Sequence, residues 1–397
     1  MDRKTTFWGR YSRFAGITII AALAVLGCAN FSKLDIPANA FLPSGGGVLT
    51  PQMNTRRTNS VDHDVRPPYQ ILWSKRSRSS VTDHPLAVDN YLIYTLQNGT
   101  LGILNIERGE KIGDGHIAPG FRHAPTIADQ TVYYSADLGK KTLGAFDFRT
   151  MKRAWQREFP QLNTSPLLVK DKIYVGANDG SLICAEKKSG EKKWAFQSGE
   201  SIFGNPAYLD GKIYFANVKG KMFCLDTTRG NLLWEKMLSE NIYAGPVAVA
   251  EGIFIGSTSG IMYALEPESG ELKWQFETGG SIYGNAAYRN SVLYFGNNDH
   301  KLFAMETNNG YRLWYFVAGG IINQPPLVGP EFVYFASWDK NFYVLDRGSG
   351  ELIYRQEFKK SIKSSPIIYQ NKIFLNVANY RFYCLANENI AKAGKPK

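Results

Sequence analysis

Residues 170–194 read KDKIYVGANDGSLICAEKKSGEKKW, and closely similar stretches follow at 210–234 and 250–274. The tryptophan is the clearest marker of this repeat, because each copy stands four positions after a turn residue. The tryptophans are Trp155, Trp194, Trp234, Trp274 and Trp314, after Met151, Gly190, Gly230, Gly270 and Gly310. A second marker opens each unit in the same register: Pro85, Pro125, Pro166, Pro206, Pro246, Ala286, Pro326 and Pro366. Successive tryptophans lie about 40 residues apart. A repeat of about 40 residues is typical of helical arrays or of β-propeller blades.

The composition of the unit favours strands over helices. Runs such as 172–176 and 212–215 are short, rich in β-branched and aromatic residues, and bounded by Gly, Asn and Asp. Each unit therefore predicts four strands: one after the proline, the Ile-Tyr run, one like 181–185, and one that carries the tryptophan. Gly180 supplies the positive φ of a tight turn. Later units have His300, Lys340 and Tyr380 at this place, which predicts looser turns there.

The two ends of the repeat complement each other. Trp73 precedes Pro85 by the same spacing that separates Trp194 from Pro206, so residues 69–78 predict a fourth strand with no unit in front of it. The unit opened by Pro366 lacks its tryptophan strand. We therefore expect an all-β fold over residues 69–390, an eight-bladed β-propeller of four-stranded antiparallel blades, closed by the N-terminal strand joining the last blade. Such a ring folds as one domain.

The unit resembles the PQQ-type propeller repeat, over roughly residues 69–388. The resemblance is carried by Ile173-Tyr174-x-Gly176, Asp179-Gly180-x-Leu182, Ala264-Leu265-Glu266 and Ser189-Gly190-Glu191-x-x-Trp194. This repeat is shared by quinoprotein dehydrogenases and by the BamB family of outer-membrane assembly lipoproteins. The resemblance implies a non-catalytic, lipid-anchored scaffold of the bacterial cell envelope that binds protein partners and supports outer-membrane protein assembly.

The alternative is a periplasmic quinoprotein (PQQ-dependent) dehydrogenase, or a propeller that binds a small molecule or glycan. By resemblance, quinoprotein dehydrogenases carry an adjacent cysteine pair beside the cofactor and a calcium ion, and this sequence has no adjacent cysteines. The five histidines show no metal-ligand spacing, and no serine motif indicates a nucleophile. We expect no enzymatic activity, no cofactor and no metal.

Residues 1–27 predict a lipoprotein-type signal peptide. Four basic residues precede the apolar run 14–27, which is too short to span a bilayer as a mature helix. The run ends in Val25-Leu26-Gly27-Cys28, which resembles a lipobox and predicts lipidation at Cys28. A simple uncleaved anchor is the alternative. By resemblance, Ala29 after the cysteine implies sorting to the outer membrane, with the protein on its periplasmic face. Residues 28–68 predict a flexible tether, and residues 391–397 a basic tail.

The formal net charge is +11, of which positions 1–27 contribute +3 and the rest of the chain +8. An exported protein seldom meets nucleic acid, so we expect none as a partner. Anionic lipid headgroups or acidic polymers are candidate neighbours, and diffuse charge that favours solubility is the alternative. Cys184, Cys224 and Cys384 occupy equivalent third-strand positions in different units, and we expect separate, buried free thiols.

A propeller without catalytic activity usually binds its partners on its faces or in its central funnel. The loops that enter the innermost strands are therefore candidate binding elements. The residues three places before each unit's start form one ring under eightfold geometry: Thr82, Arg122, Asn163, Phe203, Tyr243, Tyr283, Asn323 and Lys363. The three aromatic residues fall in adjacent blades. We predict a partner-binding rim of Arg122, Asn163, Phe203, Tyr243, Tyr283, Asn323 and Lys363. The alternative is that the aromatic rings pack onto the blade ends.

Overall fold

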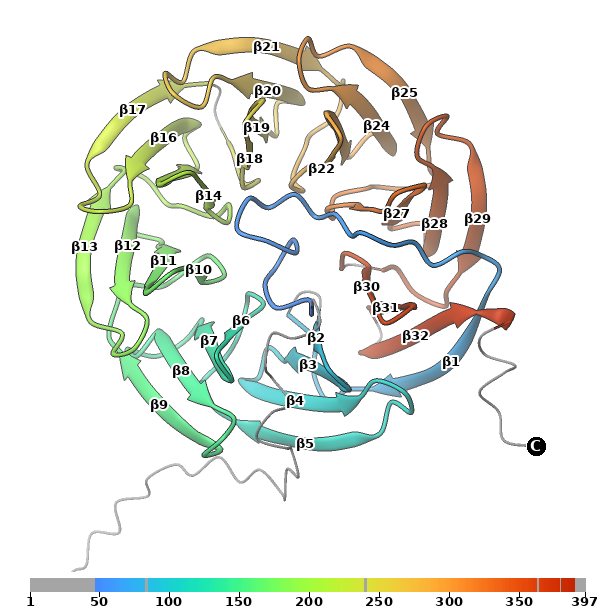
Figure 1. The fold of residues 1–397 in the computed structure, drawn as a ribbon, viewed down its shortest axis with the longest axis horizontal. Coiled ribbons are helices and arrows are strands. Elements are labelled where there is room, and N and C mark those ends of the chain that lie inside the picture. The colour runs from blue at the N-terminus through green and yellow to red at the C-terminus, as the bar shows by residue number, and fades with distance from the viewer. Residues whose placement is uncertain (1–46, 83–84, 239–240, 363, 379, 390–397) are drawn as a thin grey trace, which may run out of the picture.

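The computed structural model describes residues 47–82, 85–238, 241–362, 364–378 and 380–389. Eight four-stranded antiparallel sheets stand around a central axis, as Figure 1 shows. The predicted eight-bladed β-propeller is confirmed. The strands of blades 1–4 are β2 (Leu86–Val88), β3 (Tyr91–Thr95), β4 (Thr100–Asn105), β5 (Lys111–His116); β6 (Thr126–Ala128), β7 (Thr131–Ser135), β8 (Leu143–Asp147), β9 (Lys152–Arg157); β10 (Leu167–Val169), β11 (Lys172–Gly176), β12 (Ser181–Glu186), β13 (Lys192–Gln197); β14 (Ala207–Leu209), β15 (Lys212–Ala216), β16 (Lys221–Asp226) and β17 (Leu232–Met237).

The strands of blades 5–8 are β18 (Val247–Val249), β19 (Gly252–Gly256), β20 (Ile261–Leu265), β21 (Leu272–Glu277); β22 (Ala287–Arg289), β23 (Val292–Gly296), β24 (Lys301–Glu306), β25 (Arg312–Val317); β26 (Leu327–Val328), β27 (Phe332–Ala336), β28 (Asn341–Asp346), β29 (Leu352–Glu357); β30 (Ile367–Tyr369), β31 (Lys372–Val377), β32 (Arg381–Asn387) and β1 (Tyr69–Arg76). In each blade the first strand lies nearest the axis and the last forms the outer wall. The described part contains no helix long and apolar enough to cross a bilayer.

The ring closes as the two ends of the repeat predicted. Strand β1 is the outer strand of blade 8 and pairs with β32, and Trp73 lies opposite Cys384. Trp194 lies opposite Cys184 in the same way in blade 3. The N-terminal strand thus supplies the tryptophan that the last unit lacks, and the seam has the same pairing as the other blades.

The tryptophans join neighbouring blades. Trp194 of blade 3 packs on Gly230 of blade 4, where a Cβ atom would lie 2.5 Å from the indole. Trp234 packs likewise on Gly270, and its Nε1 donates to the Pro267 carbonyl at 3.0 Å. The tryptophans therefore form part of the core between neighbouring blades. The described cysteines, Cys184, Cys224 and Cys384, are buried free thiols, as predicted.

The tight turns between second and third strands share one backbone conformation, although the residue at the turn differs between blades. Gly180, Gly220 and Gly260 have φ values of 86°, 84° and 83°. His300 and Lys340 adopt φ values of 63° and 75°, in the same left-handed region. The prediction of looser turns in the later units is therefore wrong. His300 and Lys340 adopt the left-handed backbone conformation, which costs more energy for them than for glycine.

The N-terminal segment before β1 differs most from expectation. Figure 1 shows this segment, in blue, crossing the centre of the ring. Val48 pairs with Ala87 of blade 1, and Arg57 and Val65 are buried. The predicted flexible tether over residues 28–68 is therefore wrong for residues 47–68, because their backbone is bonded to the blades. Residues 28–46 lie outside the described residues, as do Cys28, the signal peptide 1–27 and the tail 391–397.

Candidate interaction site

The loops that enter the innermost strands meet as a continuous rim on one face of the ring. The loops touch through backbone: a Cβ atom on Gly204 would lie 2.2 Å from the carbonyl oxygen of Ala244 in the next blade. Asparagine side chains tie adjacent loops together. Asn205 accepts from the Ser165 amide, and Asn285 accepts from the Gly245 amide, both at 2.8 Å. These bonds join the loops of adjacent blades and so restrain the relative positions of the side chains that the loops carry.

Three aromatic side chains form a contiguous arc on this rim, in blades 4, 5 and 6. The ring centroids of Phe203 and Tyr243 are 5.5 Å apart, and those of Tyr243 and Tyr283 are 5.9 Å apart. Tyr243 is 38% exposed and Tyr283 is 42% exposed. The rings therefore pack on one another and still present large apolar faces to solvent. We call Phe203, Tyr243 and Tyr283 the aromatic arc.

The other predicted rim residues have different settings. Asn163 is buried, and its Nδ2 donates to Oδ1 of Asn178 at 3.3 Å, so it supports the rim from within. Arg122 is exposed and pairs with Asp137 at 3.2 Å. Asn323 is half-buried beside the channel mouth. Thr82 bonds to Thr95 at 2.7 Å, and Lys363 lies outside the described residues. The arc and Arg122 are thus the described rim residues open to a partner.

The same half of the ring carries apolar groups on its wall. In the described chain, most exposed large apolar side chains outside the rim lie along the outer edges of blades 4–7: Leu232, Leu233, Met237, Leu272, Tyr311, Leu313, Tyr315, Val317, Leu352 and Ile353. Exposed apolar surface of this extent is typical of surfaces that bind other macromolecules.

Residues 48–61 occupy the axial channel. The innermost strand of a blade has one edge without a neighbouring strand, and the segment supplies its backbone partners. Tyr208, Ala248 and Tyr288 donate their amides to the carbonyls of Thr55, Arg56 and Thr58, at 2.7–3.1 Å. Ile127 and Val328 donate in the same way to Leu49 and Asn59. We call residues 48–61 the axial segment.

A buried arginine anchors the axial segment. Arg57 has no solvent exposure; its Nε donates to the Pro206 carbonyl at 3.0 Å and its Nη1 to the Pro51 carbonyl at 2.8 Å. No described carboxylate forms an ion pair with it. Burial lowers the pKa of Arg57 to about 9, since a charge without a counter-ion is costly away from water. The carbonyl bonds offset part of that cost.

A cavity of about 350 Å³ remains at the channel mouth on the rim face. It is lined by Gln52 of the axial segment, by Tyr283 and Asn285 of blade 6, and by Asn323 of blade 7. Buried polar atoms of these lining residues have no hydrogen-bond partner within the described part of the chain, namely Gln52 Oε1, Asn285 Nδ2 and Asn323 Oδ1. Polar atoms in such a position are expected to bond to water or to a small polar molecule.

The described residues do not fit the pyrroloquinoline quinone that the resemblance raises. Cys184, Cys224 and Cys384 lie on β12, β16 and β32 of three different blades, so no two can act as an adjacent pair. The axial segment occupies the channel. Within the described ranges, no three His, Cys, Asp or Glu side chains come together as a metal site.

Comparison with known proteins gives the family. A family profile described as outer membrane protein assembly factor BamB matches residues 70–196 and 194–319. The chain belongs to this family. No curated protein matches it.

Solved structures share the fold of this BamB-family chain. BamB from Moraxella catarrhalis has 18% identity and a TM-score of 0.65, covering 80% of this chain and 100% of that chain. A europium-containing methanol dehydrogenase has 12% identity and a TM-score of 0.74, with 86% and 98% covered. The computationally designed Ika8 protein has 15% identity and a TM-score of 0.70, with 79% and 99% covered. At these identities the likeness shows the fold alone.

Sequence reasoning on this BamB-family chain missed the axial segment and its anchor Arg57. Residues 48–61 have no hydrophobic period, and their contacts use backbone carbonyls that any residue provides. The sequence does offer one signal, because Arg56 and Arg57 are the charged residues of a stretch that is otherwise uncharged.

Proposed function

We propose that this protein is a non-catalytic scaffold of the bacterial cell envelope, which binds protein partners through the aromatic arc and supports outer-membrane protein assembly. Family membership supports this proposal, because the family is described as an outer-membrane assembly factor. The single observation that carries it is the arc itself: two tyrosines and a phenylalanine from three adjacent blades, which pack against one another and are partly exposed on the rim.

The chemistry of the arc suits protein contacts. Aromatic side chains supply large contact areas at low cost in conformational entropy, and they dominate the affinity of many interfaces. Here the entropy cost is lower still, since the rings already restrain one another. Arg122 lies on the same rim and can contribute at its margin. We propose that a partner covers Tyr243 and Tyr283 together.

The axial segment argues against a function based on an axial ligand. A ligand on the ring axis would have to displace at least five backbone hydrogen bonds from innermost strands and a buried arginine. Breaking such bonds without replacement costs about 1–3 kcal/mol for each buried group. We therefore propose that the faces carry the function, and that no cofactor takes part.

The sequence and the family support a proposal for where the protein is placed. We propose that Cys28 is acylated and anchors the chain to the periplasmic face of the outer membrane. More than one acyl chain at a single cysteine satisfies the requirement for stable anchoring. The family description, which refers to outer-membrane assembly, supports this placement.

Affinity capture tests the function. The full chain and the double variant Tyr243→Ala/Tyr283→Ala are used to capture partners from solubilised cell envelopes, with quantitative mass spectrometry. Loss of two interface tyrosines costs about 2–4 kcal/mol, so we expect the captured partner to fall at least tenfold. Ile71→Ala, at an exposed apolar residue on the outer strand of blade 8, is the control and should leave capture unchanged. Equal capture by all three proteins would contradict the proposal.

A second candidate function is the binding of a small polar molecule at the channel mouth. The buried polar atoms of Gln52, Asn285 and Asn323 favour it, because they face a cavity of about 350 Å³. Isothermal titration with monosaccharides, comparing the full chain with Asn285→Leu, separates the two candidates. If neither protein shows a heat of binding, the small-molecule function is excluded for these sugars, and partner docking stays the only candidate of the two.

A further inference from the structure

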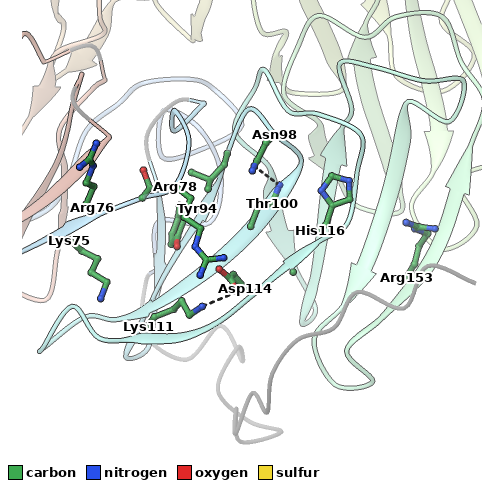
Figure 2. A pocket seen from close by; sticks show the side chains of 13 residues that line it. Lys75, Arg76, Arg78, Tyr94, Asn98, Thr100, Lys111, Asp114, His116 and Arg153 are labelled. Atoms are coloured by element: carbon green, nitrogen blue, oxygen red, sulfur yellow. Dashed lines mark hydrogen bonds and ion pairs between the residues drawn. The ribbon is translucent and has the colours of Figure 1, made fainter.

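A second hollow lies at the outer wall where blades 8 and 1 meet, away from the rim arc. Figure 2 shows the side chains around it. Its volume is about 680 Å³, and its lining includes Lys75 and Arg78 of the seam, Tyr94, Lys111 and His116 of blade 1, and Arg153 of blade 2. The hollow is open to solvent and large enough for a ligand of the size of a lipid headgroup or a sugar phosphate.

Blade 1 departs from most of its sister blades at the wall of this hollow, and blade 2 departs in the same way, with Tyr134 over Gly144. The third residue of its third strand is Gly102, where five sisters have Ile183, Phe223, Tyr263, Phe303 and Tyr343. In blades 4, 6 and 7 the ring at this position stacks on a second-strand ring, as Phe223 does on Phe215 at 5.1 Å. In blade 1 the ring of Tyr94 lies over Gly102 instead, within 2.2 Å of where a Cβ would be. One aromatic layer is missing, and Tyr94 lines the space.

The charge of the hollow is strongly positive. Five cationic side chains line it, together with His116, against the single carboxylate of Asp114. Lys111 pairs with that carboxylate at 3.1 Å, a contact drawn in Figure 2. Lys75, Arg76, Arg78 and Arg153 form no ion pair with any residue that the structure describes. The hollow therefore has cations that no described carboxylate neutralises.

The positive region continues onto blade 2. An adjoining hollow of about 450 Å³ shares His116 and Arg153 and adds Lys140 and Lys141, against Glu158. Arg153 stands between the two hollows, and its Nη2 donates to the Ile117 carbonyl at 3.0 Å. This bond positions the guanidinium. The two hollows together form a basic groove across blades 8, 1 and 2, opposite the arc of blades 4–6 on the ring.

We propose that the hollow at the seam binds a phosphate-bearing ligand, with the phosphate between Arg78, Lys75 and Lys111 and the carbon skeleton against Tyr94. Arginine and lysine together suit a phosphate group, since guanidinium bonds it through two donors and ammonium adds a compact charge. The phosphate can belong to an anionic membrane lipid or to a soluble sugar phosphate. This inference does not rest on the proposed function, because the arc is in other blades.

A titration with two kinds of ligand tests the site and identifies the source of the phosphate. The full chain in neutral maltoside micelles is titrated with dioctanoyl phosphatidylglycerol, with dioctanoylglycerol, which lacks the phosphate, and with glucose 6-phosphate. The site variant is Lys75→Glu/Arg78→Glu. The control is Lys192→Glu/Lys236→Glu, which makes the same change in charge at exposed positions on the outer strands of blades 3 and 4. Melting temperatures of all three proteins verify folding.

We expect the wild-type chain and the control to bind the phosphatidylglycerol at least tenfold more tightly than the dioctanoylglycerol, and the site variant to lose that preference. Binding of glucose 6-phosphate alone, lost in the site variant, also supports the site and assigns it a soluble ligand. Absence of binding in both arms, or equal losses in the site and control variants, would overturn the proposal. Partner capture through the arc should be unchanged in the site variant, which keeps the two hypotheses apart.

Discussion

At the scale of single residues, the same contact recurs between neighbouring blades: a tryptophan of one blade packs on a turn glycine of the next. Gly230 has a φ of 74° and leaves no room for a Cβ beside Trp194, so two separate constraints act on it. Gly211 has a φ of 84° and open space around it, so only the backbone constraint acts there. A comparison of substitutions at these two glycines therefore distinguishes the cost of the left-handed backbone from the cost of crowding the indole.

We predict that Gly211→Ala lowers the free energy of unfolding by about 1–2 kcal/mol, the cost of a left-handed alanine. Gly230→Ala should cost at least about 2 kcal/mol more, since its methyl group must displace the indole of Trp194. Urea unfolding monitored by circular dichroism measures both. Equal losses in the two variants would show that the indole contact does not stabilise the junction between blades.

A buried thiol gives a pH-dependent prediction. Burial raises the pKa of Cys184 from 9.0 to about 11. The unfolded chain therefore loses this proton first, so the contribution to stability is complete below pH 9 and is lost as the pH rises towards 11. Between pH 8 and 10.5, the wild type should lose about 1–2 kcal/mol more than Cys184→Ala. Alanine is the matched replacement, because Ala264 and Ala304 stand at this position in other blades. If the free energies of unfolding of the wild type and Cys184→Ala changed equally with pH, the raised pKa of Cys184 would be contradicted.

At the scale of elements, what the sequence predicted depends on whether side chains or backbone make the contacts. The strands of the described blades follow from a repeat in which side-chain size, turn glycines and tryptophans recur, and the spacing of Trp73 alone predicts β1. The axial segment was not predicted, because its carbonyls bond to the innermost strands regardless of residue type. The arc was predicted from register, since eightfold geometry places equivalent positions on one ring.

The hollow at the seam shows how a departure from the repeat carries information. Gly102 stands where large side chains stand in five sister blades, and the cations Lys75, Arg76 and Arg78 are close together in the sequence. Neither feature indicates a hollow alone. Only the pairing of β1 with β32 brings the basic stretch beside blade 1, so the site depends on ring closure.

At the scale of the whole molecule, the ring has two unlike halves and a filled centre. Blades 4–7 carry the aromatic arc and the apolar wall, whereas blades 8, 1 and 2 carry the basic groove. The axial segment bonds to the innermost strands of blades 1, 2, 4, 5, 6 and 7, and so holds both halves about one axis. A molecule built in this way can contact a protein partner on one side and an anionic ligand on the other.

We propose that the protein works through its surfaces, because residues 48–61 occupy its channel. Hydrogen exchange at the amides of Tyr208, Ala248 and Tyr288, followed by NMR or mass spectrometry in the full chain, tests it most directly. These amides point to the axis and donate to the axial segment. We expect them to exchange as slowly as the amides within the sheets. Exchange at the rate of an unstructured chain would show that the channel is open and that the axial segment does not occupy it.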